Sequence, residues 1–323
     1  MKIDKSKTSS IRKAFGKTLA EIGELNEKIV VMDADLACST QTKIFADKFP
    51  DRFFDCGIAE QNMLATAAGL ASEGKIPFVA SFAVFVTGRT YDQIRNGICY
   101  PNFNVKIVGT HGGVTVGEDG ATHQALEDIS LMRGLPHMTV IVPADCKECQ
   151  EAIKYAALHE GPTYIRIPRS NVPDIFDENY SFNVQKAVVV EEGTDASVFT
   201  NGETLAEVLL VAEELKKENI KLEVINVPVV KPLDSQTVIE SVKKTKLAIT
   251  VENHSIIGGL GSAICETLAD KLPSKVYRFG IHDEFGQSGK AEELIEYYGL
   301  DSKTLAKRIR AIIKKEKEQG NIW

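Results

Sequence analysis

The sequence predicts an α/β protein of two domains, each with a mostly parallel sheet flanked by helices. Its 323 residues are enough for two ordinary domains. Short runs of valine and isoleucine alternate with helical patterns, which is typical of parallel strands buried on both faces. A polar, turn-rich segment without periodicity predicts a linker over residues 171–184. The expected domains therefore cover residues 1–170 and 185–323.

The elements of the first domain follow from runs of β-branched and aromatic residues between helical patterns. In chain order we expect a helix over residues 11–26, the strands "IVVMD" and "RFFDC", a helix from about Ile58, the strand "IPFVAS", a helix over residues 90–98, and the strands "NVKIVGT", "MTVIVPAD" and "PTYIRIP".

The second series predicts another domain of the same class. Its expected strands are "KAVVVEEG", "ASVFTN", "KLEVINVPVVKP", "KLAITVEN" and "KVYRFGI", and its helices cover residues 205–218, 234–244, from 261 onward, and 302–317. The glycines of "HSIIGGLGS" precede a helix, where a nucleotide could bind. Because the G-x-G-x-x-G pattern is absent, a scaffold and subunit-contact role is favoured.

Composition narrows the class of protein. The net charge of −7 argues against a general nucleic-acid binder. No apolar stretch is long enough for a membrane span, and no apolar segment follows the basic N-terminus, so no secretory signal is expected. Six scattered cysteines indicate reduced thiols in a cytoplasmic protein. Cys146 and Cys149 form a C-x-x-C pair, but without a second pair they favour two helix residues one turn apart.

A glutamate, Glu60, stands in the first turn of the helix in "GIAEQNMLATAAGLAS". A carboxylate at a helix N-terminus is favourable by itself. The alanines and glycine behind it, however, predict a helix that approaches another backbone closely. Two rings, Phe82 and Phe85, follow the next strand with Arg89 close behind, and they either belong to the core or line a slot for a flat heteroaromatic ring.

The segment "GTHGGVTVGEDGATHQALED" gathers His111, Asp119 and His123 among several glycines. Glycine density of this kind brings backbone close to a ligand. The histidine spacing is not that of a metal site, so a polar substrate pocket is the preferred interpretation over a metal site or solvated loop histidines. Arg166 and Arg169 end the strand in "YIRIPRSN", where an arginine suits a phosphate.

Taken in order, "GIAEQNM", "SFAVF…DQIR", "GEDGATHQALED" and "VKPLD…VEN…GGLGS…SGKAEEL" closely resemble transketolase over nearly the whole chain. The resemblance covers only the pyrimidine-binding and C-terminal domains. The GDG…N metal motif of the family's diphosphate-binding domain is not found. The chain is thus expected to be the C-terminal subunit of a split transketolase, with an N-terminal partner subunit, as an α2β2 assembly.

The resemblance implies the cofactor thiamine diphosphate, with Mg2+ or Ca2+ held by the partner subunit and no metal ligand in this chain. Glu60 matches the glutamate that bonds N1′ of the cofactor aminopyrimidine, and Phe82 and Phe85 match the rings packed on that pyrimidine. Together with His111 and His123, Glu60 is expected to be catalytic. The implied reaction moves a two-carbon ketol unit from a ketose phosphate to an aldose phosphate.

The implied substrate-binding residues are His111, Asp119, His123, Arg169 and Arg89. The segment "ADLACSTQTK" corresponds to a loop where many relatives place a phosphate-binding arginine, and its nearest match here is Lys43. Phosphate recognition is therefore expected to be weaker or built differently.

Two alternatives remain open at this point. A 1-deoxyxylulose-5-phosphate synthase-like or dehydrogenase E1-β-like subunit shares the architecture. A non-catalytic assembly subunit could keep the fold, although joint retention of Glu60, His111, Asp119 and His123 argues against it.

Overall fold

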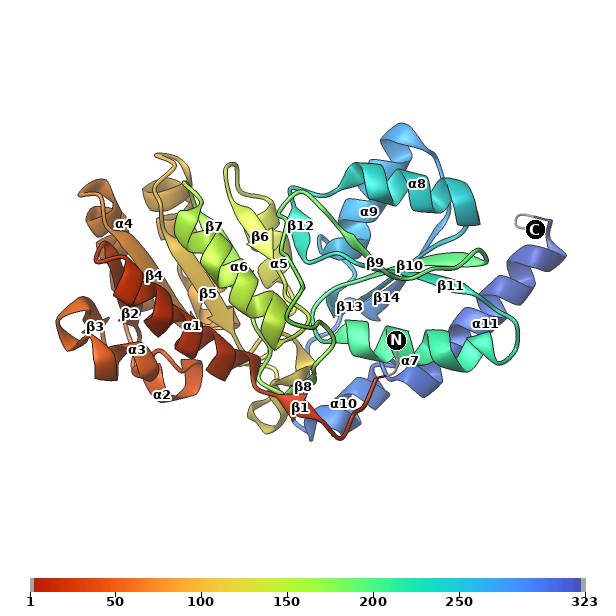
Figure 1. The fold of residues 1–323 in the computed structure, drawn as a ribbon, viewed down its shortest axis with the longest axis horizontal. Helices are drawn as coiled ribbons and strands as arrows, with labels where there is room; N and C mark the ends of the chain where they lie inside the picture. Colours follow the sequence, from red (N-terminus) through yellow and green to blue (C-terminus); the bar gives the residue numbers. More distant parts are fainter. Residues whose placement is uncertain (1–2, 321–323) are drawn as a thin grey trace.

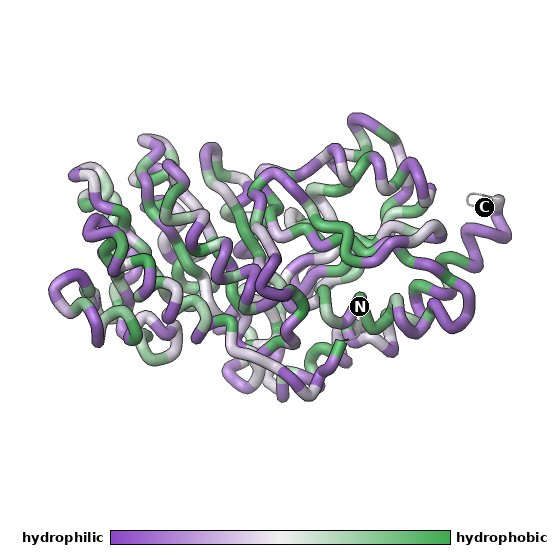
Figure 2. Tube along the Cα trace, in the orientation of Figure 1, coloured by the Kyte–Doolittle hydropathy of each residue, from purple (hydrophilic) through white to green (hydrophobic). Residues whose placement is uncertain are grey.

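The computed structural model describes residues 3–320, and its two large sheets lie side by side with helices on both faces of each (Figure 1). This arrangement confirms the predicted two-domain α/β class. The strands contain the most apolar parts of the trace, which run through the interior of both halves (Figure 2). None of the helices within residues 3–320 has the length and apolarity that a membrane crossing requires.

The first sheet has seven strands in the order β12-β6-β7-β5-β4-β2-β3. All neighbours are parallel except the edge strand β12, which is antiparallel to β6. The strands are β2 (Ile29–Asp33), β3 (Phe53–Asp55), β4 (Ile76–Phe82), β5 (Lys106–Thr110), β6 (Thr139–Ile141), β7 (Thr163–Arg166) and β12 (Val229–Lys231). Because parallel strands end at the same edge, the segments after β2, β3, β4, β5 and β7 meet there.

Helices α1 (Ile11–Leu25) and α6 (Cys146–Leu158) cover one face of this sheet, and α4 (Glu60–Ser72) and α5 (Asp128–Arg133) cover the other (Figure 1). Cys149 is buried among the apolar side chains of α6, and burial raises the pKa of the Cys146 thiol to about 12. These thiols are therefore inert helix residues, as expected for the C-x-x-C pair.

The helix predicted over residues 90–98 is confirmed to within a residue, since residues 91–99 are helical, with a π-helical part at Gln93–Cys99. A second π-helical turn, Phe85–Arg89, precedes it and was not predicted. The hydroxyl of Thr87 donates to the carbonyl of Ala83 at 2.7 Å, and that of Thr90 donates to the carbonyl of Val86 at 2.6 Å. Such back-bonding competes with the regular helical pattern and bends the chain.

The second sheet has the order β14-β13-β10-β11-β9, parallel except for the edge strand β9. Helices α7 and α11 cover one face, and α8 and α9 cover the other. The elements are β9 (Val188–Glu191), β10 (Ala196–Thr200), α7 (Thr204–Lys216), β11 (Leu222–Asn226), α8 (Ser235–Thr245), β13 (Ala248–Ser255), α9 (Leu260–Lys271), β14 (Val276–Ile281), α10 (Ala291–Tyr297) and α11 (Ser302–Glu318).

The run "KLEVINVPVVKP", expected as one strand, forms two strands in different sheets. Its first part is β11 of the second sheet, and after Pro228 the chain crosses to form β12 at the edge of the first sheet. The amide of Val142 donates to the carbonyl of Pro228 at 2.7 Å, beside the β12–β6 pairing. The second half of the chain therefore completes the sheet of the first.

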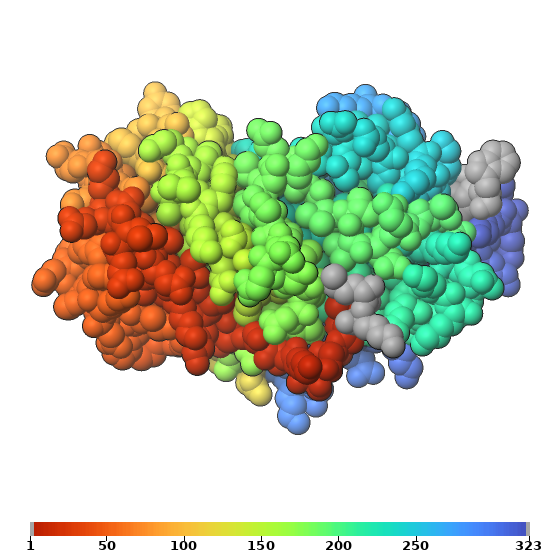
Figure 3. All heavy atoms as spheres, viewed as in Figure 1, coloured from red at the N-terminus to blue at the C-terminus, as the bar shows by residue number. Residues whose placement is uncertain are grey.

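The segment between the sheets lies on the surface across their junction (Figure 3). Its start is paired by a short antiparallel ladder between β1 (Thr8–Ser9) and β8 (Val172–Pro173). Asp145, at the N-cap of α6, accepts hydrogen bonds from the amides of Ile175 at 2.8 Å and Phe176 at 2.7 Å. The predicted linker is thus fastened to the first sheet's helices at defined points.

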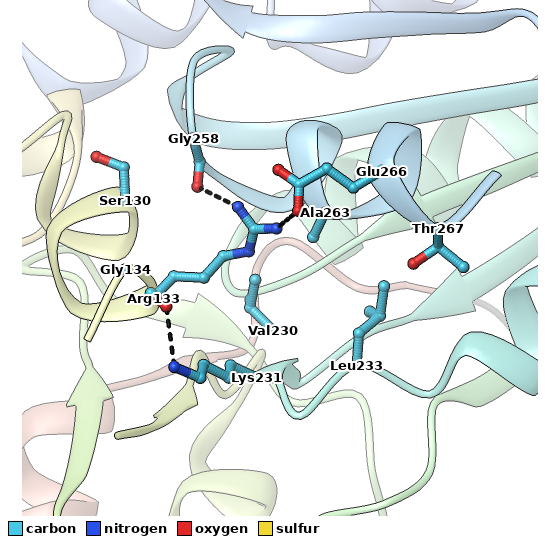
Figure 4. Close-up of a pocket in the computed structure, with 10 residues that line it drawn as sticks. All are labelled: Ser130, Arg133, Gly134, Val230, Lys231, Leu233, Gly258, Ala263, Glu266 and Thr267. Carbon is cyan, nitrogen blue, oxygen red and sulfur yellow. Dashed lines mark hydrogen bonds and ion pairs between the residues drawn. The ribbon is translucent and has the colours of Figure 1, made fainter. Parts of the chain in front are cut away.

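A groove of about 460 Å³ lies at the seam between the domains, lined by α5, β12 and α9 (Figure 4). Arg133 reaches across it, pairs with Glu266 and donates to the carbonyl of Gly258 at 3.3 Å. The ammonium of Lys231 donates to the carbonyl of Arg133 at 3.1 Å. Both cations of the groove are therefore used to join the two domains.

Candidate active site

Two aspartates at strand ends, Asp33 and Asp55, hold the loops around the site through hydrogen bonds. Asp33, at the end of β2, accepts from the amide of Leu36 at 2.7 Å and from the hydroxyls of Thr40 at 2.7 Å and Thr42 at 2.8 Å. Asp55, at the end of β3, accepts from the amides of residues 35 and 57. Burial raises the pKa of Asp33, although its hydrogen bonds oppose this. The loop after β2 is thereby fixed over the sheet edge.

Glu60 is the first residue of α4, and its side chain is only 2% exposed. Its Oε2 accepts from Nη1 of Arg89 at 2.9 Å. The guanidinium carbon of Arg89 lies 4.6 Å from the ring centroid of Phe85, and Gln61 donates to the backbone carbonyl of Arg89 at 3.1 Å. The structure therefore places the predicted Glu60 and Phe85 together, with Arg89 between them.

The small-residue helix α4 has two different faces. Met63, Leu64 and Ala67 are buried against the sheet, whereas Ala65 and Gly69 are exposed. A Cβ added at Gly69 would meet nothing within 4 Å. The close neighbour expected for this helix is therefore not among the described residues on that face.

Four rings form a contiguous wall at the ends of β4 and β5. Phe82 and Phe85 are nearly parallel, with ring centroids 5.8 Å apart and planes at 14°. His111 stacks on Phe82 at 3.7 Å, and His123 meets Phe85 edge-on at 5.3 Å. The sequence-predicted aromatic and histidine residues, which are up to 41 positions apart, are thus brought together.

His111 is held in a neutral state. Its backbone has φ of 59°, and its Nδ1 lies 2.9 Å from the hydroxyl of Thr110. Burial, and after it the electrostatic effects of Arg12, Arg169 and His123, together lower the pKa of His111 to about 3. A neutral imidazole can accept or donate one hydrogen bond to a polar substrate without carrying charge.

Arg169, predicted from the sequence, donates to the carbonyl of Val116, and its Nη1 is 3.7 Å from both Glu118 and Asp119. Asp119 therefore lies close to this arginine. The charge of Arg169 also acts on His111, one of the four rings of the wall. The structure does not place Arg89 in this group: its contacts are with Glu60, Phe85 and Gln61.

Sequence reasoning missed Arg12, in the first turn of α1. Its guanidinium donates to the carbonyl of Ser39 at 2.7 Å and to the carbonyl of Arg169 at 3.1 Å, while its Nε is buried without a partner. Arg12 thus joins the loop after β2 to the segment after β7. The only sequence signal is a cation on the buried side of an otherwise apolar helix face.

Lys43, considered from the sequence as the replacement for a phosphate-binding arginine, is not at the site. Its ammonium donates to Asp47 at 2.6 Å, and its side chain is 55% exposed. The arginine that contacts the "ADLACSTQTK" loop comes from α1 instead.

Cofactor chemistry can be tested against these groups. A buried carboxyl beside stacked rings fits an aminopyrimidine, because the rings supply an apolar slot and the carboxyl supplies a hydrogen-bonding group. Within residues 3–320, no group of three or more His, Cys, Asp or Glu side chains could hold a metal ion. The nucleotide alternative at α9 is disfavoured, because Glu252 already accepts from the amides of Leu260 and Gly261 at 2.7 and 2.8 Å.

Comparison with known proteins gives the same domain pair. Residues 7–174 match the family described as transketolase, pyrimidine binding domain, and residues 185–305 match transketolase, C-terminal domain. A transketolase C-terminal section from Methanocaldococcus jannaschii is 48% identical over 95% of this chain and 97% of its own length. A 6-deoxy-6-sulfo-D-fructose transketolase subunit from Clostridium sp. is 40% identical, over 95% of each chain.

The solved structures include a similar chain, described as a split gene transketolase in an inactive β4 tetramer. It has a TM-score of 0.87 and 45% identity, and the match covers 95% of this chain and 97% of that chain.

Proposed function

This chain belongs to the transketolase family as its C-terminal section, and we propose that it works with an N-terminal partner subunit in thiamine-diphosphate-dependent transfer of a two-carbon ketol unit between sugars. The observation that carries the proposal is the buried Glu60 beside the ring wall, with Arg12 and Arg169 at the same sheet edge. The carboxyl and the rings are assigned to the cofactor, and the arginines are assigned to the substrate.

The cofactor's pyrimidine half is assigned to Glu60, Phe82 and Phe85. Phe82 and Phe85 offer a flat apolar surface, and Glu60 is a buried carboxyl that can share a proton with a ring nitrogen. When bound, thiamine diphosphate supplies a nucleophilic carbon for the ketose carbonyl. Glu60 acts by holding the proton at the pyrimidine nitrogen, and the aromatic wall excludes water from it.

The substrate is assigned to the histidines and arginines. His111 and His123 line the wall where sugar hydroxyls would lie, and neutral His111 can pass or hold a proton at a hydroxyl. Arg12 and Arg169 provide positive charge for an anionic end group, either a phosphate or, as the name of the Clostridium relative suggests for that protein, a sulfonate. Asp119 is assigned to a sugar hydroxyl.

A partner subunit is supported by the open surface around Glu60. Ile58 is 79% exposed, and Cβ atoms at Gly57, Gly69 and Gly88 would meet nothing within 4 Å. This apolar, small-residue surface suits a second backbone that would bring the diphosphate and metal sites. An α2β2 assembly and Mg2+ or Ca2+ on the partner remain parts of the proposal.

The test mixes this chain with a purified N-terminal transketolase subunit, thiamine diphosphate and Mg2+, and measures ketol transfer from xylulose 5-phosphate to ribose 5-phosphate. The mixture should be active and each subunit alone inactive. Glu60→Gln should lower kcat by about 100-fold or more, since a positioned acid–base group contributes about 10²–10⁴-fold. Glu73→Gln, at the exposed C-terminal end of the same helix, is the matched control and should leave the rate unchanged.

Retention of near-normal kcat by the Glu60→Gln complex would remove Glu60 from the reaction. Full activity of this chain alone would refute the need for a partner. Decarboxylation of pyruvate with transfer of its remaining two-carbon acyl unit, and no ketol transfer between sugars, would favour the synthase-like or dehydrogenase-like alternative.

A further inference from the structure

Arg89 covers both groups that a cofactor pyrimidine would need. Its Nη1 donates to Oε2 of Glu60 at 2.9 Å, and its guanidinium carbon lies 4.6 Å from the ring centroid of Phe85. The side chain of Arg89 is 46% exposed, whereas that of Glu60 is 2% exposed. Arg89 is therefore the solvent-facing partner of a carboxylate that is itself out of water.

The ion pair and the cofactor bond make opposite demands on Glu60. A guanidinium carries only donors and keeps its proton in proteins, so its bonded partner is favoured as an ionised carboxylate. A pyrimidine nitrogen is an acceptor, and it can bond to Glu60 only when the carboxyl carries a proton to share. The two bonds to the same group therefore compete.

The local backbone lets the Arg89 side chain leave without repacking the core. Gln61 holds the backbone carbonyl of Arg89 at 3.1 Å, so the main chain has an anchor of its own. The neighbouring Gly88 has open space, since a Cβ there would meet nothing within 4 Å. Rotation of this half-exposed side chain would remove its contacts with Glu60 and with the Phe85 ring.

We propose that Arg89 is a lock on Glu60, closed in the unassembled chain and opened when the cofactor pyrimidine binds; the inference rests on the proposed function. Opening breaks one N–H···O bond, the carboxyl takes a proton from solvent, and one O–H···N bond forms to the ring. Arg89 is thus a positioning residue that sets when Glu60 becomes available. It also weakens binding of the pyrimidine half by the chain alone, before its partner is present.

The experiment uses the full chain alone and the probe 4-amino-5-hydroxymethyl-2-methylpyrimidine, which is the pyrimidine half of the cofactor. Calorimetry gives the affinity, and the ultraviolet difference spectrum of the probe reports its protonation. Arg89→Gln should bind the probe about tenfold more tightly than the unchanged chain, because a charge-assisted bond to Glu60 no longer has to be broken. Arg89→Lys, which keeps the charge, should restore weak binding.

Two controls locate the effect. Arg95→Gln changes an exposed arginine of the next helical turn, which donates to Asn96 and not to Glu60, and it should bind like the unchanged chain. Arg89→Gln combined with Glu60→Gln should lose the gain, because the probe's proton-sharing group is then gone.

The lock would be overturned if Arg89→Gln bound the probe no more tightly than the unchanged chain, or if neither bound it detectably. It would also be overturned if the gain in affinity survived removal of Glu60. Failure of the lock is distinguished from failure of the proposed function by the assembled complex. In the assembled complex, a strong loss of ketol transfer in Glu60→Gln would support the proposed function, whatever the effect of Arg89→Gln on probe binding.

Discussion

Arg12 shows how one side chain can connect distant parts of the site. It begins in α1 yet bonds to backbone carbonyls of Ser39 and Arg169, and its charge lowers the pKa of His111 after the larger effect of burial. The guanidinium suits this work because its donors are spread in a rigid fork that can reach two acceptors at once.

Removal of the Arg12 charge should therefore be visible at His111. We expect Arg12→Met to raise the His111 pKa from about 3, because one of the positive charges that lower it is lost. In the assembled enzyme it should raise the KM of the anionic substrate about tenfold or more, with a smaller change in kcat. An NMR titration of the histidine ring and steady-state kinetics measure the two effects.

The matched control for Arg12→Met is Lys13→Met, which removes an equal charge from the exposed side of the same helix turn. An unmoved His111 titration in Arg12→Met, or an equal shift in Lys13→Met, would contradict the role given to Arg12.

At this scale the sequence predicted many of the residues that the structure brings together in the candidate site. Glu60, Phe82, Phe85, His111 and His123 stand in motifs whose spacing and resemblance are local, so they could be found without coordinates. Arg12 could not, because its partners lie 27 and 157 positions away and nothing near it in sequence carries that information.

Elements depend on a few buried polar groups, and α6 gives the clearest case. Glu148, in its first turn, is fully buried and accepts from the amide of Ala144 at 2.7 Å, from Asn226 Nδ2 at 2.8 Å and from the hydroxyl of Tyr180. Burial raises the pKa of Glu148 to about 7, although these hydrogen bonds oppose the rise. One carboxyl thus ties α6 to the linker and to β11 of the second domain.

The Glu148 shift predicts how stability changes with pH. Its folded pKa of about 7 lies above the ordinary 4.5, so the folded chain binds this proton more tightly than the unfolded chain does. The contribution is therefore complete below about pH 4.5 and is lost as the pH rises through 7. Relative to the unchanged chain, Glu148→Gln should gain up to about 3 kcal/mol of unfolding free energy between pH 4.5 and 8.

Urea unfolding at several pH values measures this difference. Glu151→Gln on the same helix is the control: although partial burial opposes it, Lys154 and Lys147 lower the Glu151 pKa, so its slope should have the opposite sign. A flat difference for Glu148→Gln across this range would show that the carboxyl does not take up a proton on folding.

Element types were easier to predict than their exact course. The helices of α1, α8 and α11 agree with the predicted ranges to within a residue or two, because each has a side-chain cap at its start and a clear apolar face. The turns around Arg89 were missed, because threonine back-bonding to carbonyls depends on rotamers that an apolar pattern does not report.

The whole molecule is held together by a buried charge at the domain junction. Arg166, at the end of β7, donates to Asp128 Oδ2 at 2.9 Å and to the carbonyl of Asn253 in the second domain at 2.8 Å. Tyr164 donates to the same Asp128 oxygen at 2.6 Å. His254 lies beside this group, and burial lowers its pKa to about 4.

Arg166→Met should destabilise the chain by about 3–5 kcal/mol, because Asp128 would be left buried without its cation. Arg310→Met is the matched control, since Arg310 pairs with Glu214 and Glu218 at the surface of the second domain, and its loss should destabilise the chain much less. Urea unfolding measures both changes. Equal losses of unfolding free energy in the two variants would show that Arg166 stabilises the chain no more than a surface arginine does.

Sequence patterns could not predict this junction. Alternating strands and helices identified two sheets, but they describe only neighbours along the chain. The crossing of β12 to the first sheet depends on pairing with β6, which lies almost ninety positions earlier.

Because β12 crosses to the first sheet, the two domains cannot be separated cleanly at the linker. A fragment that stops at residue 184 would lack β12 and leave the backbone groups of β6 bare along one side. Uncovered strands of this kind recruit other chains, so the fragment would be prone to aggregate. The second half of the chain is therefore needed to complete the sheet of the first half.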